Sequence, residues 1–144
     1  MLLYLDSSAL VKLYVNEPGS DQVHTLVQQA SVVATSLIAY PEARAAVARR
    51  LREGALTADH ALRIKAGLAA DWGAFWVIPV RDDIARTAGD LSELYGLRGM
   101  EALHLASALW LDRQHEDRVR FAVWDRRLAT GAQAAGLLVV GADP

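Results

Sequence analysis

The chain contains no cysteine, which excludes disulfide bonds and metal sites built from thiolates. Any metal ion in this protein must therefore be held by oxygen atoms or by histidine. The chain also lacks an overall positive charge: its net charge is −2 at pH 7, so only a local basic patch can attract nucleic acid. No internal repeat, low-complexity segment or linker interrupts the 144 residues. We expect one domain that spans residues 1–144.

Long apolar runs are missing as well. The longest stretch without Asp, Glu, Lys or Arg, residues 22–41, contains Gln, His, Ser and Thr throughout and is not typical of a membrane span. The apolar start of the chain holds no leading Lys or Arg and reaches Asp6 at once, unlike a signal peptide. We therefore expect a cytoplasmic protein that does not enter a membrane. Its apolar fraction of 53% is slightly high for a soluble monomer, which indicates that another chain covers part of its surface.

Short apolar runs alternate with helical patterns along the chain. The runs predict five strands, at Leu2–Leu5, Val32–Thr35, Trp76–Val80, Arg120–Trp124 and Leu137–Val140. The patterns between them, with their caps and glycine stops, predict helices near residues 6–14, 20–30, 37–53, 57–72, 82–95, 100–114 and 125–135. Pro41 either begins the third of these helices in its first turn or bends it. This alternation predicts an α/β fold, a three-layer α/β/α sandwich with a central parallel sheet of about five strands.

Four acidic residues stand at or near predicted helix starts. Asp6 and Asp125 directly follow predicted strands, and Glu42 and Glu101 lie early in helices. Ligands bind parallel sheets at the edge where the strands end, and carboxylates gathered there repel one another unless a positive group sits between them. A hard divalent cation with oxygen ligands is the simplest such group. Each acid also has a plainer interpretation, as a helix cap or as a charge that the helix dipole favours.

Two further side chains lie close to these acids in the sequence. His104 follows Glu101 by one helical turn, so the two can share a helix face. We expect a packed histidine that at most steadies a neighbouring carboxylate. Arg44 is the basic residue closest to Glu42 and is a candidate for a phosphate contact.

Several motifs together resemble one known family. They are LDSSALVKLY at residues 5–14, EPGS at 17–20, SLIAYPE at 36–42, LRGMEALHLA at 97–106 and WDRRL at 124–128. In order and spacing they are similar to the PIN-domain family, and more narrowly to the VapC-type toxins of bacterial toxin–antitoxin pairs. The resemblance covers essentially the whole length of the chain.

The resemblance implies an endoribonuclease that depends on Mg²⁺ or Mn²⁺ and is inhibited by a cognate antitoxin protein. It carries the metal-binding and catalytic acids onto four positions of this chain: Asp6, Glu42, Glu101 and Asp125. Metal ions in such a site lower the pKa of a bound water, which then attacks the RNA phosphodiester in line. The candidates for holding the RNA backbone are Lys12, Arg44 and Arg98.

The chain departs from the family pattern at two positions. Glu101 stands where family members usually have Asp, and Val123 stands where they usually have a Thr or Ser hydroxyl. The longer side chain moves a carboxylate by about one bond length, and Mg²⁺ demands near-ideal octahedral geometry. Loss of a supporting hydroxyl typically costs about 10–100-fold in metal affinity or activity. The alternative function is therefore a catalytically weakened PIN-like module that acts as an RNA- or protein-binding partner.

Competing α/β enzymes lack their key residues here. A phosphotransfer receiver domain and a dehalogenase-type phosphatase each need a second acid near Asp6, where this chain has Ser7 and Ser8. No glycine-rich nucleotide motif occurs.

The predicted fourth helix has an unusually wide apolar surface, which predicts a binding partner. A helix buried on one side needs an apolar stripe of about 100° or more, and extra width indicates a second covering surface. We expect a homodimer that binds an antitoxin peptide over the third and fourth helices. The alternative is a wide groove filled by the protein's own third helix. The residues of the stripe and its flank are Ala58, Ala61, Leu62, Ile64, Leu68, Ala69 and Trp72.

Overall fold

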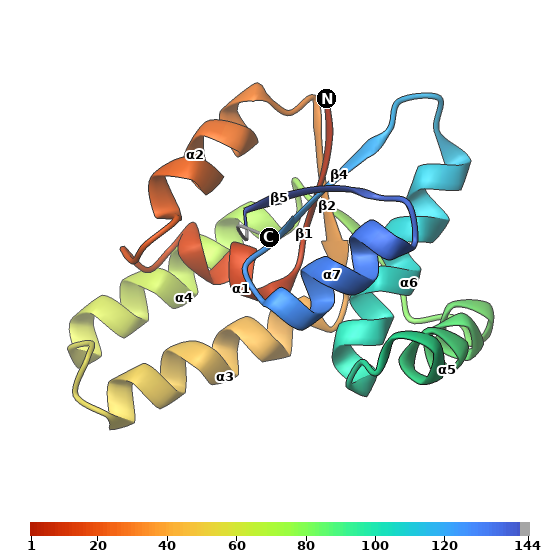
Figure 1. Cartoon of the computed structure of the whole chain (residues 1–144). Coiled ribbons are helices and arrows are strands. Elements are labelled where there is room, and N and C mark those ends of the chain that lie inside the picture. The colour runs from red at the N-terminus through yellow and green to blue at the C-terminus, as the bar shows by residue number, and fades with distance from the viewer. Residues whose placement is uncertain (142–144) are drawn as a thin grey trace.

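The computed structural model describes residues 1–141 of the chain. One five-stranded sheet runs through the molecule and helices cover both of its faces (Figure 1). The strands are β1 (Leu2–Leu5), β2 (Val32–Ser36), β3 (Trp76–Ile78), β4 (Val119–Val123) and β5 (Leu138–Gly141). The helices are α1 (Ser7–Lys12), α2 (Ser20–Gln29), α3 (Ala39–Arg52), α4 (Ala58–Trp72), α5 (Asp82–Tyr95), α6 (Gly99–Gln114) and α7 (Arg126–Ala134).

All neighbouring strands are parallel, in the order β3-β2-β1-β4-β5. The central strand β1 pairs with β2 through Leu3 and Val33, and with β4 through Leu3 and Arg120. Since β1 is covered on both faces, its four residues are all buried, which explains why it reads as a continuous apolar run.

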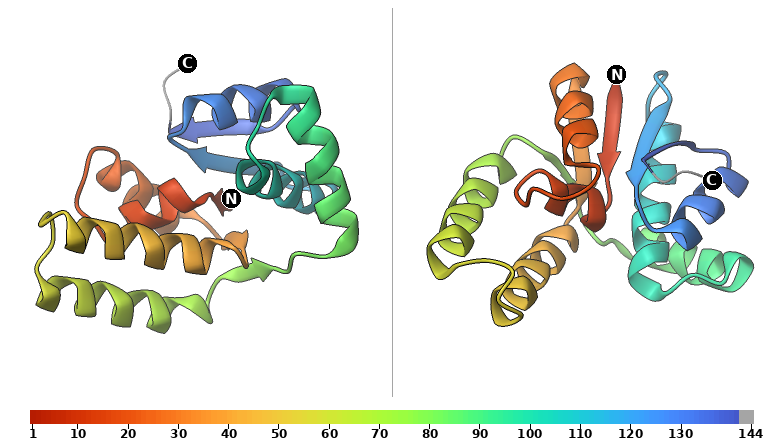
Figure 2. Two further views of the ribbon diagram at one scale, coloured as in Figure 1. Left: turned by 90° about the horizontal axis from the view of Figure 1, so that it is seen from below. Right: turned by 60° about the vertical axis from the view of Figure 1, so that its left-hand side comes forward.

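Side chains of β1 alternate between two cores, one on each face of the sheet. Leu2 and Tyr4 pack with residues of α5, α6 and α7. Leu3 and Leu5 pack with residues of α1, α2, α3 and α4. Figure 2 shows these two helical layers on either side of the sheet. The predicted three-layer α/β/α sandwich with a parallel sheet of five strands is therefore confirmed.

Element ends differ from the sequence prediction by a few residues. β3 stops at Ile78 because the next residue is Pro79, which has no N–H for the ladder. α3 begins at Ala39, so Pro41 lies in its first turn and does not bend the helix. α5 begins at Asp82, with Arg81 in the N-cap position. None of the helices within residues 1–141 is long and apolar enough to cross a membrane.

Candidate active site at the carboxyl edge of the sheet

Asp6 and Asp125 follow the ends of β1 and β4, two neighbouring strands, and each caps the next helix. The Oδ1 atom of Asp6 accepts a hydrogen bond of 2.9 Å from the backbone N–H of Ala9. The Oδ1 atom of Asp125 accepts one of 2.9 Å from the N–H of Leu128. The plainer interpretation as helix caps is thus correct for both residues. Each cap uses only one carboxylate oxygen, so capping leaves the other oxygen available to a ligand.

Asp6 is buried with few partners. The residue is only 4% exposed. Besides the cap hydrogen bond, its carboxylate accepts a 2.6 Å hydrogen bond from the Ser8 hydroxyl. The same hydroxyl accepts a 3.2 Å hydrogen bond from the backbone N–H of Trp124, which ties the ends of β1 and β4 together. Burial raises the pKa of the Asp6 carboxyl above its usual value, although the nearby His104, Ser8 and Ala9 act in the opposite direction. A cation beside Asp6 relieves this cost by favouring the ionised form.

Glu42, in the first turn of α3, is held by a buried network. His104 places Nε2 at 2.8 Å from Oε1 of Glu42 and at 2.9 Å from the Ser7 hydroxyl. Ser7 donates its hydroxyl hydrogen to the same Oε1 atom. On the other side of the ring, His104 Nδ1 lies 2.8 Å from the hydroxyl of Tyr4, a fully buried residue. Burial acts to raise the pKa of Glu42, but the His104 and Ser7 hydrogen bonds outweigh it, so this pKa is lowered.

His104 is therefore a packed histidine that contacts a carboxylate, as predicted, and that carboxylate belongs to Glu42. The residue is 3% exposed and its ring reaches across to Glu42 on α3, not back along its own helix to Glu101. Spacing along one helix could not show this contact, because 62 residues separate the two side chains in sequence.

Glu101, in the first turn of α6, has an unpaired buried oxygen. Its Oε2 atom is buried and has no hydrogen-bond partner within the described residues. Its Oε1 atom lies 3.8 Å from the Nε of Arg98, a long contact to a side chain that is 80% exposed. A contact this long to an exposed arginine contributes little, so Glu101 is almost uncompensated. A buried carboxylate oxygen without a partner is costly unless a cation or a donor binds it.

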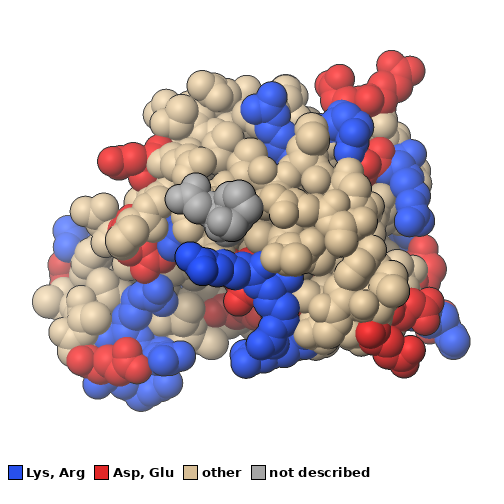
Figure 3. Space-filling view, in the orientation of Figure 1, with Lys and Arg blue, Asp and Glu red and all other residues tan. Residues whose placement is uncertain are grey.

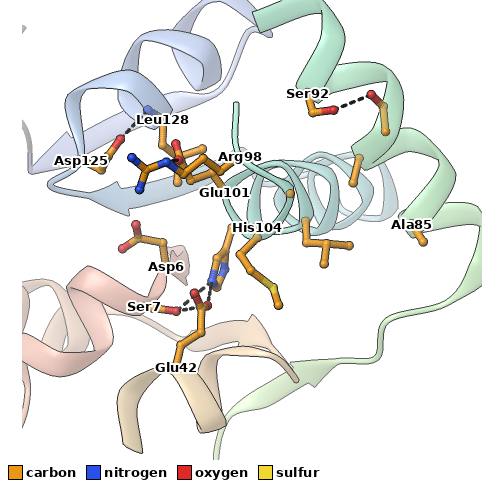
Figure 4. Close-up of a pocket in the computed structure, with 15 residues that line it drawn as sticks. Asp6, Ser7, Glu42, Ala85, Ser92, Arg98, Glu101, His104, Asp125 and Leu128 are labelled. Atoms are coloured by element: carbon orange, nitrogen blue, oxygen red, sulfur yellow. Dashed lines mark hydrogen bonds and ion pairs between the residues drawn. The ribbon is translucent and has the colours of Figure 1, made fainter. Parts of the chain in front are cut away.

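All four acids line one cavity of about 790 Å³, which Ser7, Arg98 and His104 also line. Figure 4 shows Asp6, Glu101 and Asp125 around this space, with Glu42 turned toward Ser7 and His104. In this arrangement no three His, Asp or Glu side chains among residues 1–141 are grouped closely enough to hold one metal ion. Glu42 is drawn toward Ser7 and His104 by its own hydrogen bonds.

The chemistry of the donors fits a divalent cation. Asp6 and Glu101 line the same cavity, and each has an oxygen that no hydrogen bond within residues 1–141 occupies. Carboxylate oxygens are the ligands that Mg²⁺ and Mn²⁺ prefer, and the cavity holds no thiolate to favour a softer metal.

The three basic candidates lie in different places. Arg98 lines the acidic cavity. Lys12 lies in a neighbouring cavity, which it shares with Ser7 and Glu42. Arg44 donates to the Tyr40 hydroxyl at 3.1 Å and lines a groove between α3 and α4, away from the acids.

Sequence reasoning did not identify Ser7 and Ser8 as site residues. Ser7 binds Glu42, and Ser8 binds Asp6 and the backbone at the end of β4. Two hydroxyls directly after a strand-ending aspartate were the available signal, because short hydroxyl side chains at a helix start bond to nearby polar groups.

Comparison with known proteins agrees with this geometry. A family model described as PIN domain matches residues 3–123. Ribonuclease VapC45 of Mycobacterium tuberculosis (strain CDC 1551 / Oshkosh) is 39% identical over 146 residues, which cover 99% of this chain and 96% of that protein. Ribonuclease VapC46 of M. tuberculosis (strain ATCC 25618 / H37Rv) is 33% identical over 138 residues, with 96% and 95% covered. The chain belongs to the PIN-domain family, and its full-length relatives are VapC proteins.

Solved structures show the same fold at lower identity. A toxin-antitoxin complex from Klebsiella pneumoniae matches with a TM-score of 0.64 and 22% identity, over 98% of this chain and 97% of that chain. VapC20 of M. tuberculosis, described as a sarcin-ricin loop cleaving toxin, matches with a TM-score of 0.66 and 17% identity, over 94% and 95%. These likenesses concern the fold alone.

Proposed function

We propose that this protein is a metal-dependent endoribonuclease and the toxin of a toxin–antitoxin pair. One observation carries the proposal: four carboxylates from four separate helix starts line a single cavity at the carboxyl edge of a PIN-domain sheet. The full-length relatives, which are named ribonucleases, support the same activity. The metal is Mg²⁺ or Mn²⁺, since all the candidate ligands are carboxylate oxygens.

Asp6 and Glu101 are the direct ligands in this proposal, because each offers an oxygen without a hydrogen-bond partner. Asp125, fixed by its cap, binds a second ion or orients the attacking water. Glu42 is kept ionised by His104 and acts as a ligand or, through water, as a base. When bound, the metal supplies an activated water and neutralises charge on the phosphate.

Basic side chains beside the acids hold the RNA backbone. Arg98, at the rim of the acidic cavity, and Lys12, in the adjoining cavity, are placed for this role. Arg44 faces the groove between α3 and α4, so we assign it to that groove instead.

The antitoxin binds in the α3–α4 groove, a hollow of about 350 Å³ between the two helices. α3 does not fill it: Leu62 on α4 is 65% exposed and Leu51 on α3 is 39% exposed at its walls. Exposed leucines along a groove suit the apolar face of a partner helix. Leu62→Ser is expected to weaken binding of the coexpressed antitoxin at least tenfold. Leu94→Ser, which removes an equally exposed leucine on α5, is the control that leaves binding unchanged.

A homodimer remains part of the proposal. The exposed Leu37 beside Tyr40 and Trp72 gives an apolar hollow of about 470 Å³ that a second copy can cover. Light scattering at micromolar concentration measures the oligomeric state directly. A strict monomer at that concentration would contradict the dimer but not the proposed nuclease activity.

Cleavage of single-stranded RNA with and without EDTA tests the activity. Asp6→Asn keeps the shape and capping ability of the side chain but removes its charge, so cleavage is expected to fall below detection. Asp90→Asn, on the exposed surface of α5, is the matched control and retains full activity. If purified Asp6→Asn protein cuts as fast as the wild type, the activity lies elsewhere.

One observation favours the alternative of a weakened module. Val123 is fully buried at the end of β4, so this position supplies no hydroxyl to orient Asp125. That reading predicts RNA or protein binding without metal-dependent cleavage. RNA binding by the wild type together with no cleavage in either Mg²⁺ or Mn²⁺ would select it.

A further inference from the structure

A second cavity of about 630 Å³ adjoins the acidic one. The two share Ser7 and Glu42 as a common wall. On the far side of that wall the charged lining changes to Lys12, Glu17 and Arg50. In the view of Figure 3, blue basic side chains lie over the lower middle of the molecule with red acidic ones beside them.

Glu17 lies between the two cations of this second cavity. Its Oε1 atom accepts a 3.0 Å hydrogen bond from Lys12 Nζ, and its Oε2 atom accepts one of 2.9 Å from an Arg50 Nη. The three side chains are 11% (Lys12), 21% (Glu17) and 30% (Arg50) exposed, so the cluster is largely shielded from solvent. Around Glu17 itself two cations leave one positive charge in excess, and Glu42 on the shared wall balances that charge over the whole lining.

The cations also keep unused donors. Lys12 has three N–H groups and Arg50 has five. Hydrogen bonds within residues 1–141 use one N–H of Lys12, which reaches Glu17. They use two N–H groups of Arg50, which reach Glu17 and the carbonyl of Ala46. Lys12 Nζ is further fixed 5.3 Å from the ring centroid of Trp124. Glu17 and Trp124 thus hold two positive groups in place for an anion, which a guanidinium and an ammonium both bind well.

We propose that this second cavity binds a backbone phosphate of the RNA next to the phosphate that is cut, through Lys12 and Arg50. The proposal rests on the proposed ribonuclease function, since the shared wall of Ser7 and Glu42 makes this cavity the neighbour of the cleavage site. Glu17 competes with the phosphate for the same donors, so it sets the strength of the subsite. Sequence reasoning selected Lys12 as a candidate RNA contact but did not select Arg50.

The test measures binding of a short, unstructured, fluorescein-labelled RNA to the Asp6→Asn protein without metal. Under these conditions the RNA stays uncut. The dissociation constant is measured by anisotropy over a series of KCl concentrations. Arg50→Gln is expected to lower the salt slope by about 0.7, the value for one phosphate contact on a single strand, and to weaken binding roughly fivefold near 0.1 M salt. Arg49, the residue before Arg50, is 72% exposed and paired with Glu53, so Arg49→Gln is expected to leave both quantities unchanged.

Glu17→Gln gives the opposite and more selective result. It keeps an oxygen that accepts from Lys12 and Arg50 but removes the competing charge, so RNA binding is expected to tighten severalfold. If Glu17 serves only to hold the fold, the same variant binds RNA equally or more weakly, which overturns the proposal. Equal effects of Arg49→Gln and Arg50→Gln overturn it too. If Arg50→Gln fails to fold, the Glu17→Gln measurement decides alone.

The two levels of the proposal fail differently. Absence of metal-dependent cleavage by the wild type contradicts the ribonuclease function and is measured separately from binding. Cleavage by the wild type together with unchanged RNA binding by Arg50→Gln and Glu17→Gln removes the phosphate subsite and leaves the ribonuclease function standing.

Discussion

Replacing Tyr4 with phenylalanine removes one oxygen atom from the centre of the molecule. The Tyr4 hydroxyl is fully buried on β1 and lies 2.8 Å from Nδ1 of His104. If the hydroxyl donates to Nδ1, the ring carries its proton on Nε2, which faces Glu42 at 2.8 Å. A residue in the core of one sheet face thereby sets the tautomer that supports a carboxylate at the sheet edge.

The cost of Tyr4→Phe follows from this geometry. The ring stays and keeps its packing on Phe121 and His104, while Nδ1 of His104 is left buried without its partner. An orphaned buried acceptor costs about 1–3 kcal/mol. For a chain of this size each kcal/mol lowers the melting temperature by roughly 2–4 °C. Tyr40→Phe removes a hydroxyl that is only partly buried, and is expected to cost less than about 0.5 kcal/mol.

Urea unfolding followed by tryptophan fluorescence gives the free energies of the two variants. ¹⁵N NMR of the imidazole then reports the tautomer of His104: protonation on Nε2 in the wild type, and a mixture of tautomers in Tyr4→Phe. Equal stability of Tyr4→Phe and wild type, or a His104 spectrum that the substitution leaves unchanged, would refute the proposed link of hydrogen bonds from Tyr4 through His104 to Glu42.

Three further changes have expected outcomes. Glu101→Asp restores the usual ligand length of the family, so RNA cleavage in Mg²⁺ and in Mn²⁺ is expected to stay equal or rise; a collapse in both metals means that the site has adapted to glutamate. The pKa of Glu17 is lowered because the Lys12 and Arg50 hydrogen bonds outweigh burial. Its ion pairs therefore stabilise the fold above the unfolded pKa near 4.5, and the difference in unfolding free energy between wild type and Glu17→Gln shrinks as the pH falls below that value. Gly19→Ala places a Cβ 2.7 Å from the Trp124 ring at a φ of 94°, so a loss of about 1–3 kcal/mol is expected in the same unfolding assay.

The fold could be predicted because its local signals agree with its global arrangement. Thr57 and Asp125 cap helices at the predicted starts near residues 57 and 125, and Gly96, with a φ of 65°, ends α5. The central strand β1 reads as an apolar run because helices cover both of its faces. Errors are confined to element ends, where a single residue such as Pro79 decides the boundary.

The candidate site was predicted less completely, because its supporting contacts join distant parts of the chain. Tyr4 and His104 are 100 residues apart, and Arg50 and Glu17 are 33 apart. Tyr4 looks like any core residue of a buried strand, and nothing in its neighbours shows that its hydroxyl meets a histidine. Periodicity places residues on faces, but which faces meet across the sheet depends on the packing of the helices.

The carboxylates differ in how well the protein compensates them, and Asp6 is compensated less than Glu42 or Glu17. Glu42 has His104 and Glu17 has two cations, whereas Asp6 has one hydroxyl and one backbone N–H as hydrogen-bond donors. Because burial raises the pKa of Asp6, its ionised form opposes folding at neutral pH and this cost is lost only as the pH falls through the raised pKa.

Asp6→Asn is therefore expected to raise the melting temperature of the metal-free protein at pH 7 while it abolishes cleavage. Asparagine still caps α1 but carries no charge to bury. Added Mg²⁺ or Mn²⁺ should stabilise the wild type and leave the variant unchanged, because the cation offsets a charge that only the wild type has. A variant that is less stable than the wild type without metal would show that Asp6 is compensated within the fold, and its burial could then no longer be attributed to a cation.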